Sequence, residues 1–372
     1  MFKILKEDKK SGARVGILKV GNRKVKTPFF MPVATKASAK HINSLDMKSM
    51  GADAIICNSF ILYLRPGIEI IKKFKGLHGF MNYDGIIFTD SGGFQMLKPS
   101  LLQKIEDHGV TFKSPFDGIS HTMTPEKAME VQLSLGSDVA MALDDVRHHT
   151  GMHDEMHDAM LRTHYWAKRC KVMHDTLKKK MKSKQLLFAI TQGGLYKDLR
   201  KESADFINSL DTDGIAIGGL RIGESRKLFL DTIKEHMKDI RKDKPHYLMG
   251  VGSPVDIVEA IANGIDCFDS RMPTMCARHG TIFTSKGTLR LMQAVHRKSK
   301  LPLDKNCDCF VCKNYSRAYL NFELSQDEAV GLRACSYHNL YFLQKLCEKA
   351  RVAIQKGKFS EFRKKLLKDY KE

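Results

Sequence analysis

The sequence predicts an α/β fold, a (β/α)8 or TIM barrel followed by a smaller C-terminal subdomain. Three observations carry this prediction. Short apolar runs alternate with helical patterns eight times, polar and glycine residues follow most of the runs, and a cysteine cluster stands beyond the last of them. The length of 372 residues suits one such barrel, which typically takes about 250 residues plus insertions.

The candidate strands are apolar runs rich in Ile, Val, Phe, Met or Ala. They lack a clean alternation of polar and apolar residues, as is typical of parallel strands that are buried on both faces. The predicted strands are Phe29–Ala34, Ala54–Asn58, Gly85–Asp90, Val139–Asp145, Leu187–Gln192, Gly214–Gly219, His246–Val251 and Cys267–Ser270.

Helical patterns lie between these runs, and Pro125 and Pro254 stand where first-turn prolines belong. The clearest predicted helices are Pro125–Leu135, His153–Lys180, Leu199–Leu210, Ser225–Ile240 and Pro254–Asn263. Eight strands alternating with helices favour a closed barrel. A doubly wound open sheet is the structural alternative, but it rarely contains eight such runs in strict alternation.

The ends of the candidate strands carry residues that could perform chemistry. They are Thr89-Asp90-Ser91-Gly92-Gly93, Asp144-Asp145, Gln192-Gly193-Gly194, Gly218-Gly219, Met249-Gly250-Val251-Gly252 and Asp269-Ser270. A single aspartate could be a helix N-cap, but three at separate strand ends are hard to explain as caps alone. Because reactive groups collect at the carboxyl ends of barrel strands, the sequence predicts an active site there. The glycines would let backbone groups approach a flat ligand.

The cluster Cys307-x-Cys309-x2-Cys312, with His338 farther along, predicts a structural zinc site of the Cys3His type. Four protein ligands leave no coordination position for a catalytic water. Cys335 is an alternative fourth ligand that spacing alone does not exclude, and three chance thiols in a loop are the simplest alternative to a site. The predicted domains are a barrel over 1–290, a zinc-binding subdomain over 291–350 and a C-terminal helix over 351–372 that packs back on the barrel.

Composition and charge indicate the kind of partner and the cellular compartment of the protein. The formal net charge of +20 favours a polyanionic partner, because Lys and Arg neutralise phosphates. The longest apolar stretches fall short of the roughly 20 residues that a membrane helix needs, and the first ten residues lack the apolar core of a secretory signal. Nine cysteines are too few for a disulfide scaffold, so we expect a cytoplasmic protein.

Basic residues gather along the chain after the eighth predicted strand. They are Arg271, Arg278, His279, Lys286, Arg290, Arg297, Lys298 and Lys300. This basic track would lie on the side of the barrel where a phosphate backbone could reach the aspartates.

The segment Thr89-Asp90-Ser91-Gly92-Gly93-Phe94-Gln95 resembles tRNA-guanine transglycosylases, the queuine tRNA-ribosyltransferase family, in its bacterial and eukaryotic wobble-position form. Other segments that match are Asn58…Leu64-Arg65-Pro66-Gly67, Leu143-Asp144-Asp145-Val146, Gln192-Gly193-Gly194-Leu195-Tyr196-Lys197-Asp198-Leu199-Arg200, Ile217-Gly218-Gly219-Leu220, Tyr247-Leu248-Met249-Gly250-Val251-Gly252, Phe268-Asp269…Pro273-Thr274 and the cysteine cluster with His338. They keep the order of the family over nearly the whole chain, and the family has a zinc-bearing (β/α)8 barrel.

The resemblance implies that the protein exchanges guanine at the wobble position of tRNA for a 7-deazaguanine base, either queuine or a precursor of it. Asp269 matches the nucleophile that attacks the ribose C1′, and Asp90 matches the general acid/base. Asp144 and Gln192 match residues that hydrogen-bond the edge of the base, assisted by the backbone of Gly219 and Leu220. Phe94 and Met249 would cover the two faces of the base, Ser91 lies beside the acid/base, and Arg271 and Arg278 would bind tRNA.

Some positions depart from the family pattern. Val146 resembles the queuine-using eukaryotic form, whereas Ile222 is bulky where that form has glycine, so the incoming base stays open. Met275 replaces an arginine that usually helps to read the anticodon loop, while Arg278 keeps the second one. Ser59-Phe60-Ile61 replaces the usual Thr-Tyr-His.

The resemblance also implies a homodimer, because Tyr315, Tyr319 and Phe322 match an aromatic patch that family dimers use. Packing of the zinc subdomain onto the barrel is the alternative role for these rings. The alternative functions are a non-catalytic tRNA-binding subunit, a transglycosylase that acts at another tRNA position (the archaeosine type), and a barrel glycosidase. The two aspartates argue against the first, the absence of additional C-terminal domains against the second, and the basic track against the third.

Overall fold

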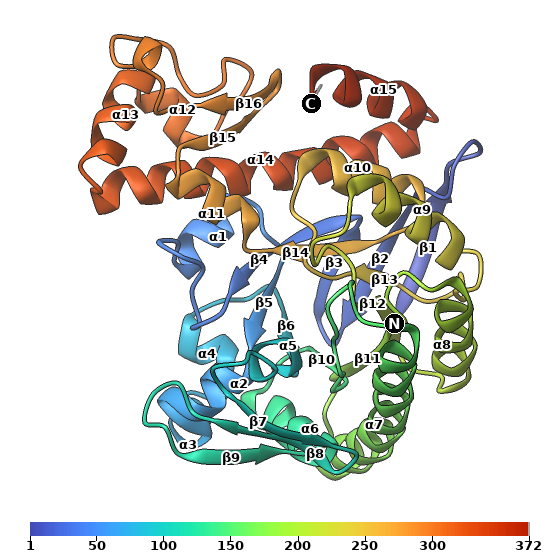
Figure 1. The fold of residues 1–372 in the computed structure, drawn as a ribbon. Coiled ribbons are helices and arrows are strands. Elements are labelled where there is room, and N and C mark those ends of the chain that lie inside the picture. The colour runs from blue at the N-terminus through green and yellow to red at the C-terminus, as the bar shows by residue number, and fades with distance from the viewer. Residues whose placement is uncertain (371–372) are drawn as a thin grey trace.

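The computed structural model describes residues 1–370, which form a closed barrel of eight parallel strands (Figure 1). The strands are β4 (Phe29–Ala34), β5 (Ala54–Asn58), β6 (Ile86–Asp90), β10 (Val139–Met141), β11 (Leu186–Thr191), β12 (Gly214–Ile217), β13 (His246–Leu248) and β14 (Cys267–Ser270). They pair in chain order, and β14 closes the barrel by pairing with β4. The predicted fold class is confirmed, and each predicted strand overlaps one of these eight.

The strands are apolar throughout because both of their faces are buried. In β4, Phe29 and Met31 belong to the cluster inside the barrel, while Phe30 packs outward against the helices. Phe88 fills the barrel centre, with its ring centroid 5.6 Å from that of Phe188. A Cβ on Gly214 would lie 2.4 Å from the Phe188 ring, so this strand needs glycine at its first position.

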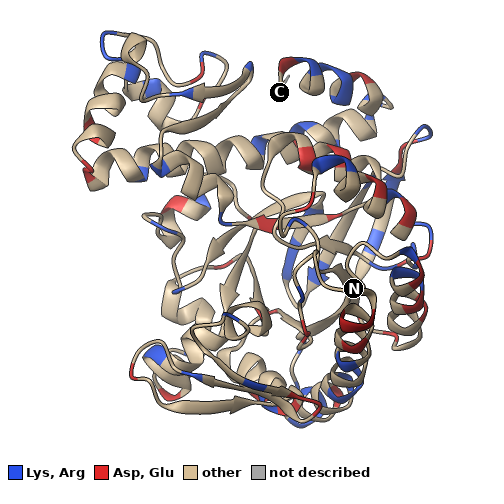
Figure 2. Ribbon diagram, viewed as in Figure 1, with Lys and Arg blue, Asp and Glu red and all other residues tan. Residues whose placement is uncertain are grey.

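The outer helices follow the predictions closely. They are α6 (Pro125–Leu135), α7 (His153–Lys180), α8 (Lys197–Ser209), α9 (Arg226–His236) and α10 (Pro254–Ala262). The acidic first turn and the lysine-rich last turn of α7 both suit the helix dipole (Figure 2). Shorter helical segments follow β4, β5 and β6, namely α1 (Ser44–Ser49), α2 (Ser59–Leu62), η1 (Tyr63–Gly67), α3 (Ile68–Lys73), α4 (Leu77–Met81) and α5 (Gly93–Met96).

Two antiparallel sheets lie outside the predicted alternation. One contains β1 (Phe2–Glu7), β2 (Arg14–Val20) and β3 (Arg23–Thr27), and the other contains β7 (Leu102–Glu106), β8 (Gly109–Lys113) and β9 (Ser120–Met123). Leu18, Val20 and Val25 of the first sheet join the cluster inside the barrel. They therefore close the end of the barrel opposite the carboxyl ends of the strands.

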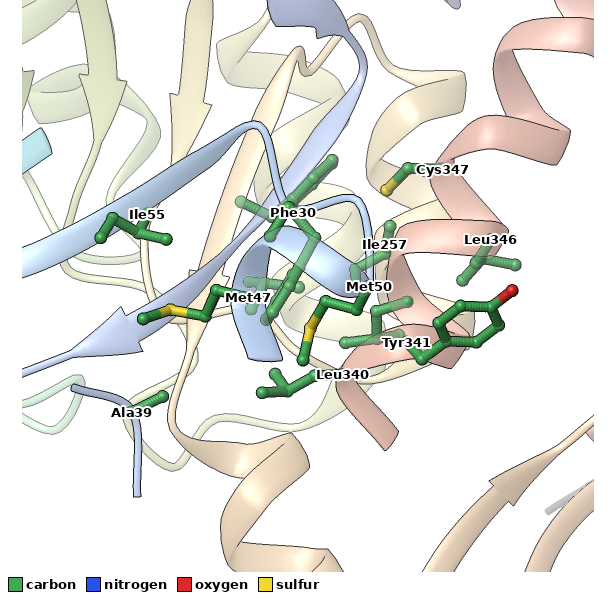
Figure 3. Close-up of a cluster of buried hydrophobic side chains, with 14 of the residues drawn as sticks. Phe30, Ala39, Met47, Met50, Ile55, Ile257, Leu340, Tyr341, Leu346 and Cys347 are labelled. Atoms are coloured by element: carbon green, nitrogen blue, oxygen red, sulfur yellow. The ribbon is translucent and has the colours of Figure 1, made fainter. Parts of the chain in front are cut away.

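The C-terminal part rests on one long helix, α14 (Ala329–Gln355), that crosses the barrel (Figure 1). Leu340 and Leu346 of this helix lie in one buried cluster with Phe30, Met47 and Met50 (Figure 3). The other elements here are α11 (Met272–Arg278), β15 (Thr281–Thr284), β16 (Gly287–Arg290), η2 (Ala294–His296), α12 (Phe310–Asn314), α13 (Arg317–Ser325) and α15 (Phe359–Asp369).

The predicted division at residues 290 and 350 stays a prediction, and α14 runs without interruption through residue 350. In α15, Arg363 donates two hydrogen bonds to Glu259 of α10, at 3.0 and 2.7 Å. Within residues 1–370 no helix is both long enough and apolar enough to cross a membrane.

Candidate active site

The predicted site residues converge because all eight barrel strands run in one direction. Asp90 ends β6 and Asp269 lies in β14, while Asp144 and Gln192 follow the ends of β10 and β11. Gly219 follows the end of β12. The carboxyl ends of parallel barrel strands open at the same mouth, so the structure brings these side chains to one place.

Asp269 is held through one oxygen. Its Oδ1 accepts hydrogen bonds from the Tyr247 hydroxyl at 2.6 Å and from the Gly250 N–H at 2.9 Å. Among residues 1–370, Oδ2 accepts no hydrogen bond. Burial raises the pKa of Asp269, and the bonds from Gly250 and Tyr247 oppose this by stabilising the ionised form. The carboxylate is thus fixed in orientation with one oxygen available to react.

Asp90 lies at the same mouth in a different environment. Its Oδ2 accepts a hydrogen bond from the Asn58 amide at 3.0 Å, while its buried Oδ1 has no partner among the described residues. Burial raises the pKa of Asp90 to about 7, the Asn58 bond opposes the shift, and the charge of Asp269 adds to it. A carboxyl group with this pKa both donates and accepts protons near neutral pH.

Asp144 and Gln192 form a second pair of polar side chains. The Gln192 Nε2 donates to the Asp144 Oδ2 at 2.7 Å. Burial raises the pKa of Asp144 to about 7, Gln192 opposes the shift and the neighbouring Asp145 adds to it. Asp145 itself is paired with Arg147 and Arg162, at 2.9 and 2.7 Å. Of the two adjacent aspartates, Asp144 is therefore the one that forms no ion pair within residues 1–370.

Glycines keep this pair accessible. A Cβ on Gly218 would lie 2.6 Å from the Gln192 Nε2, and one on Gly219 would lie 2.5 Å from its Oε1. Gly219 also has a φ of +69°, which favours glycine. Leu220 follows as a buried residue, and the base-binding role of its backbone stays a prediction.

The remaining predicted base-binding residues are less constrained. Phe94 lies in α5 and is 51% exposed, so its ring is accessible to a flat ligand. Met249 is half-buried and follows β13. Ser91 is buried, and its Oγ accepts the Gly93 N–H at 3.4 Å. The stacking roles of Phe94 and Met249 stay predictions.

Three residues that support the site were assigned no role from the sequence, although Asn58 and Tyr247 stand in segments that match the family. Asn58 orients Asp90, Tyr247 orients Asp269, and Glu224 accepts the backbone N–H groups of Arg221 and Ile222. Asn58 ends a predicted strand, which could have drawn attention to it. Tyr247 lies inside a strand and Glu224 in a loop, where sequence pattern gives no indication of a partner.

The cysteine cluster is a candidate metal centre. The ligand atoms of Cys307, Cys309, Cys312 and His338 all lie within 4.8 Å of one another, and Cys335 is not among them. The His338 Nδ1 faces the three sulfur atoms, and its Nε2 donates to the Phe283 carbonyl oxygen at 2.8 Å. Such a second hydrogen bond orients histidine ligands in metal sites. The four groups suit a tetrahedral ion, and Zn²⁺ prefers this donor set.

The basic track begins beside the nucleophile candidate. Arg271 is exposed directly after β14, and Met275 is 44% exposed one turn later in α11. The Arg278 Nε donates to the Thr274 carbonyl oxygen at 3.1 Å, which fixes its stem on the same helix. Lysine and arginine also occur on many other surface elements (Figure 2). The tRNA-binding role of Arg271 and Arg278 stays a prediction.

The aromatic residues near the cluster are partly packed and partly exposed. Tyr315 and Tyr319 stack with ring centroids 5.3 Å apart. Phe322 on α13 is 58% exposed. Packing within the subdomain therefore accounts for Tyr315 but leaves the Phe322 ring at the surface.

Comparisons with known proteins agree over nearly the whole length. The family model for queuine tRNA-ribosyltransferase matches residues 8–372. A protein of that name from Caldanaerobacter subterraneus is 46% identical over 369 residues, which cover 99% of this chain and 97% of the relative. A relative of the same name from Thermoanaerobacter sp. is 44% identical with the same coverage, and one from Fusobacterium nucleatum is 43% identical over 98% of this chain and 97% of its own.

Proposed function

The chain belongs to the queuine tRNA-ribosyltransferase family and is therefore a tRNA-guanine transglycosylase of queuosine modification, and we propose that it acts at the wobble guanine through a covalent bond to Asp269. One observation supports this mechanism most. The mouth of the barrel holds one carboxylate fixed through a single oxygen and a second carboxyl group with a pKa of about 7.

In the first half-reaction, the Asp269 Oδ2 attacks the ribose C1′ of the wobble nucleotide. The bond between C1′ and the guanine nitrogen breaks, its electron pair leaves with the base, and Asp90 donates a proton to the departing guanine. The Tyr247 hydroxyl and the Gly250 N–H hydrogen-bond Oδ1 throughout, so that Oδ2 stays directed at C1′.

In the second half-reaction, the incoming 7-deazaguanine base loses a proton to the Asp90 carboxylate, and its nitrogen attacks C1′. The ester bond to Asp269 breaks, and the carboxylate is regenerated. Two displacements at one carbon retain the configuration at C1′, as in retaining glycosidases. Queuine and a smaller precursor share the guanine-like edge that this site would read.

In this scheme, Asp144 and Gln192 recognise the base. Guanine presents N–H donors next to an acceptor oxygen, and an ionised carboxylate beside an amide matches that pattern. Gly219 and Leu220 add backbone groups, and Phe94 and Met249 cover the faces of the base. The wobble guanine must leave its stack to reach the barrel mouth, and Arg271 and Arg278 would hold the backbone next to it.

We propose that the metal centre is a structural zinc site held by Cys307, Cys309, Cys312 and His338. When bound, the ion would join the loop before α12 to α14, and all four positions would be taken by protein. Because thiolate ligands must stay reduced, we also propose a cytoplasmic location.

We propose a homodimer that uses the exposed rings of Tyr319 and Phe322 on α13. Tyr319 is 39% exposed and Phe322 is 58% exposed, so part of each ring is accessible to a partner. Burial against a second copy would remove this apolar surface from water.

The proposed reaction is tested by incorporation of radiolabelled guanine into tRNA by the purified enzyme. One transcript carries guanine at the wobble position, and the matched transcript carries adenine there. We expect incorporation only into the first. Incorporation into both would place the target elsewhere in the tRNA, and incorporation into neither would contradict the proposed exchange.

The pH dependence of exchange should follow Asp90 and Asp144. Asp90 must be protonated to release guanine in the first half-reaction, so kcat/KM for tRNA should fall as the pH rises above about 7. Asp144 must be ionised to accept the N–H groups of the wobble guanine, so kcat/KM for tRNA should also fall below about 7. We expect a bell-shaped profile, with a change of about tenfold per pH unit on each limb.

Asp144→Asn is the matched variant for this profile, because its amide does not titrate. It should weaken the acid limb, leaving only the part that comes from protonation of Asp269, and keep the alkaline one. A flat profile for the wild type between pH 5.5 and 8.5 would contradict both assignments.

A further inference from the structure

Arg200 is a fully buried arginine that forms no hydrogen bond to a carboxylate in the described part of the chain. It lies on α8 and is 2% exposed. Burial lowers the pKa of its guanidinium to about 9, with Glu224 opposing the shift, so it remains charged at neutral pH. A buried charge is costly unless its hydrogen-bonding capacity is used, so its partners indicate its role.

All three hydrogen bonds of Arg200 go to backbone carbonyl oxygens at the barrel mouth. Its Nε donates to Gly194 at 2.8 Å, its Nη1 to Thr191 at 3.3 Å and its Nη2 to Gly218 at 2.8 Å. Thr191 is the last residue of β11, and Gly218 directly follows β12. One guanidinium group therefore joins the ends of two neighbouring strands.

These carbonyl groups flank the residues proposed to read the base. Thr191 and Gly194 stand on either side of Gln192, and Gly218 directly precedes Gly219. A Cβ on Gly219 would lie 3.4 Å from the Arg200 Nη2 and 2.5 Å from the Gln192 Oε1. The Arg200 guanidinium thus lies next to Gln192 and Gly219, which are proposed to hydrogen-bond the edge of the base.

A second side chain of α8 supports the same strand end. The Ser203 Oγ accepts the Gln192 backbone N–H at 3.0 Å. The same Oγ lies 3.0 Å from the His164 Nε2 of α7. Burial lowers the pKa of His164 to about 4, so the ring is neutral and serves as a hydrogen-bonding partner at neutral pH.

We propose that Arg200 is a positioning residue for base recognition, which sets the spacing between Gln192 and the Gly219-Leu220 backbone. The inference rests on the proposed function, because it takes the base edge to lie against these groups. Arginine suits the role because its planar group presents several N–H donors in fixed directions. Lysine carries the same charge, but its three N–H donors share one nitrogen and cannot take the separate places of Nε, Nη1 and Nη2.

The test compares Arg200→Lys with Arg14→Lys in guanine exchange. Arg14 is an equally buried arginine that donates to the Lys244 carbonyl oxygen at 2.6 Å and to Asp266, but it lies where β13 and β14 begin, at the other end of the barrel. We expect Arg200→Lys to raise the KM for guanine about tenfold or more, with the KM for tRNA changed less than about twofold. Arg14→Lys should lower the Tm and leave the KM for guanine unchanged.

An unchanged KM for guanine in folded Arg200→Lys would overturn the inference, whatever happens to its Tm. If this variant does not fold, Ser203→Ala decides, because it removes the acceptor for the Gln192 N–H together with the contact to the neutral His164 ring. It should raise the KM for guanine about threefold or more, and an unchanged value would overturn the inference.

Asp144→Ala separates failure of this inference from failure of the proposed base site. If Asp144→Ala raises the KM for guanine and Arg200→Lys does not, only the role of Arg200 is wrong. If Asp144→Ala also leaves the KM unchanged, the base does not bind here, and both proposals fail.

Discussion

Asp269→Asn is expected to abolish guanine exchange, with a loss of roughly four orders of magnitude or more, as for other covalent nucleophiles. The amide oxygen is neutral and cannot form a stable ester with C1′. The fold should persist, because an Asn side-chain oxygen can still accept hydrogen bonds from Tyr247 and Gly250. The measurement is incorporation of radiolabelled guanine into wobble-G tRNA under single-turnover conditions.

The Tm and the zinc content of Asp269→Asn provide the controls, and both should equal those of the wild type. Binding of tRNA should also persist, because the proposed phosphate contacts of Arg271 and Arg278 do not involve the Asp269 carboxylate. Exchange within tenfold of the wild-type rate would contradict the assignment of Asp269 as nucleophile.

Cys309→Ala should have the largest effect on stability. Cys309 is 1% exposed and contributes one of three sulfur atoms, so its removal opens the tetrahedral shell. Because structural zinc contributes directly to folding free energy, we expect a loss of several kcal/mol and a Tm lower by about 10 °C. Zinc content, measured by atomic absorption, should fall from about one ion per chain to nearly none.

Cys335→Ala is the matched control for this prediction. Cys335 is a buried thiol on α14, three residues before His338, and lies outside the cluster. It should keep its zinc. Loss of zinc from Cys335→Ala, or full zinc in Cys309→Ala, would show that the ligand set is wrong.

Loss of zinc should also affect the side of the barrel where we propose that tRNA binds. His338 donates to Phe283, and the next residue, Asn339, donates to the Pro273 carbonyl oxygen at 3.0 Å. Pro273 lies in the first turn of α11, which begins directly beyond β14. A disordered ligand loop would therefore disturb the helix that carries Arg278, and it should raise the KM for tRNA more than that for guanine.

The barrel could be predicted from the sequence because its strands are buried on both faces. Runs such as Phe29–Ala34 and Cys267–Ser270 coincide with strands at both ends. The inserted sheet of β7, β8 and β9 could not be predicted in this way. It interrupts the alternation of strands and helices, and strands such as Leu102–Glu106 are largely exposed and short, so their pattern is weak.

Within the site, residues predicted from strand ends were easier to find than those that orient them. Asp90, Asp144 and Asp269 stand out because acidic residues rarely end apolar runs. Arg200 ends a segment that matches the family, but it was assigned no role, because an arginine on an amphipathic helix normally faces solvent and only the packing of α8 against β11 buries it. Whether Cys335 or His338 is the fourth ligand depends on which of these two side chains of α14 points toward the three cysteines, and the spacing of residues in the sequence does not determine this.

The most direct test of the central claim is to trap the covalent intermediate. The enzyme is mixed with wobble-G tRNA in the absence of an incoming base, quenched with denaturant, digested with nuclease and protease, and analysed by mass spectrometry. We predict a ribonucleotide linked to the peptide that contains Asp269, and none with Asp269→Asn. A link to any other residue, or no link while the same preparation exchanges guanine, would contradict the proposed mechanism.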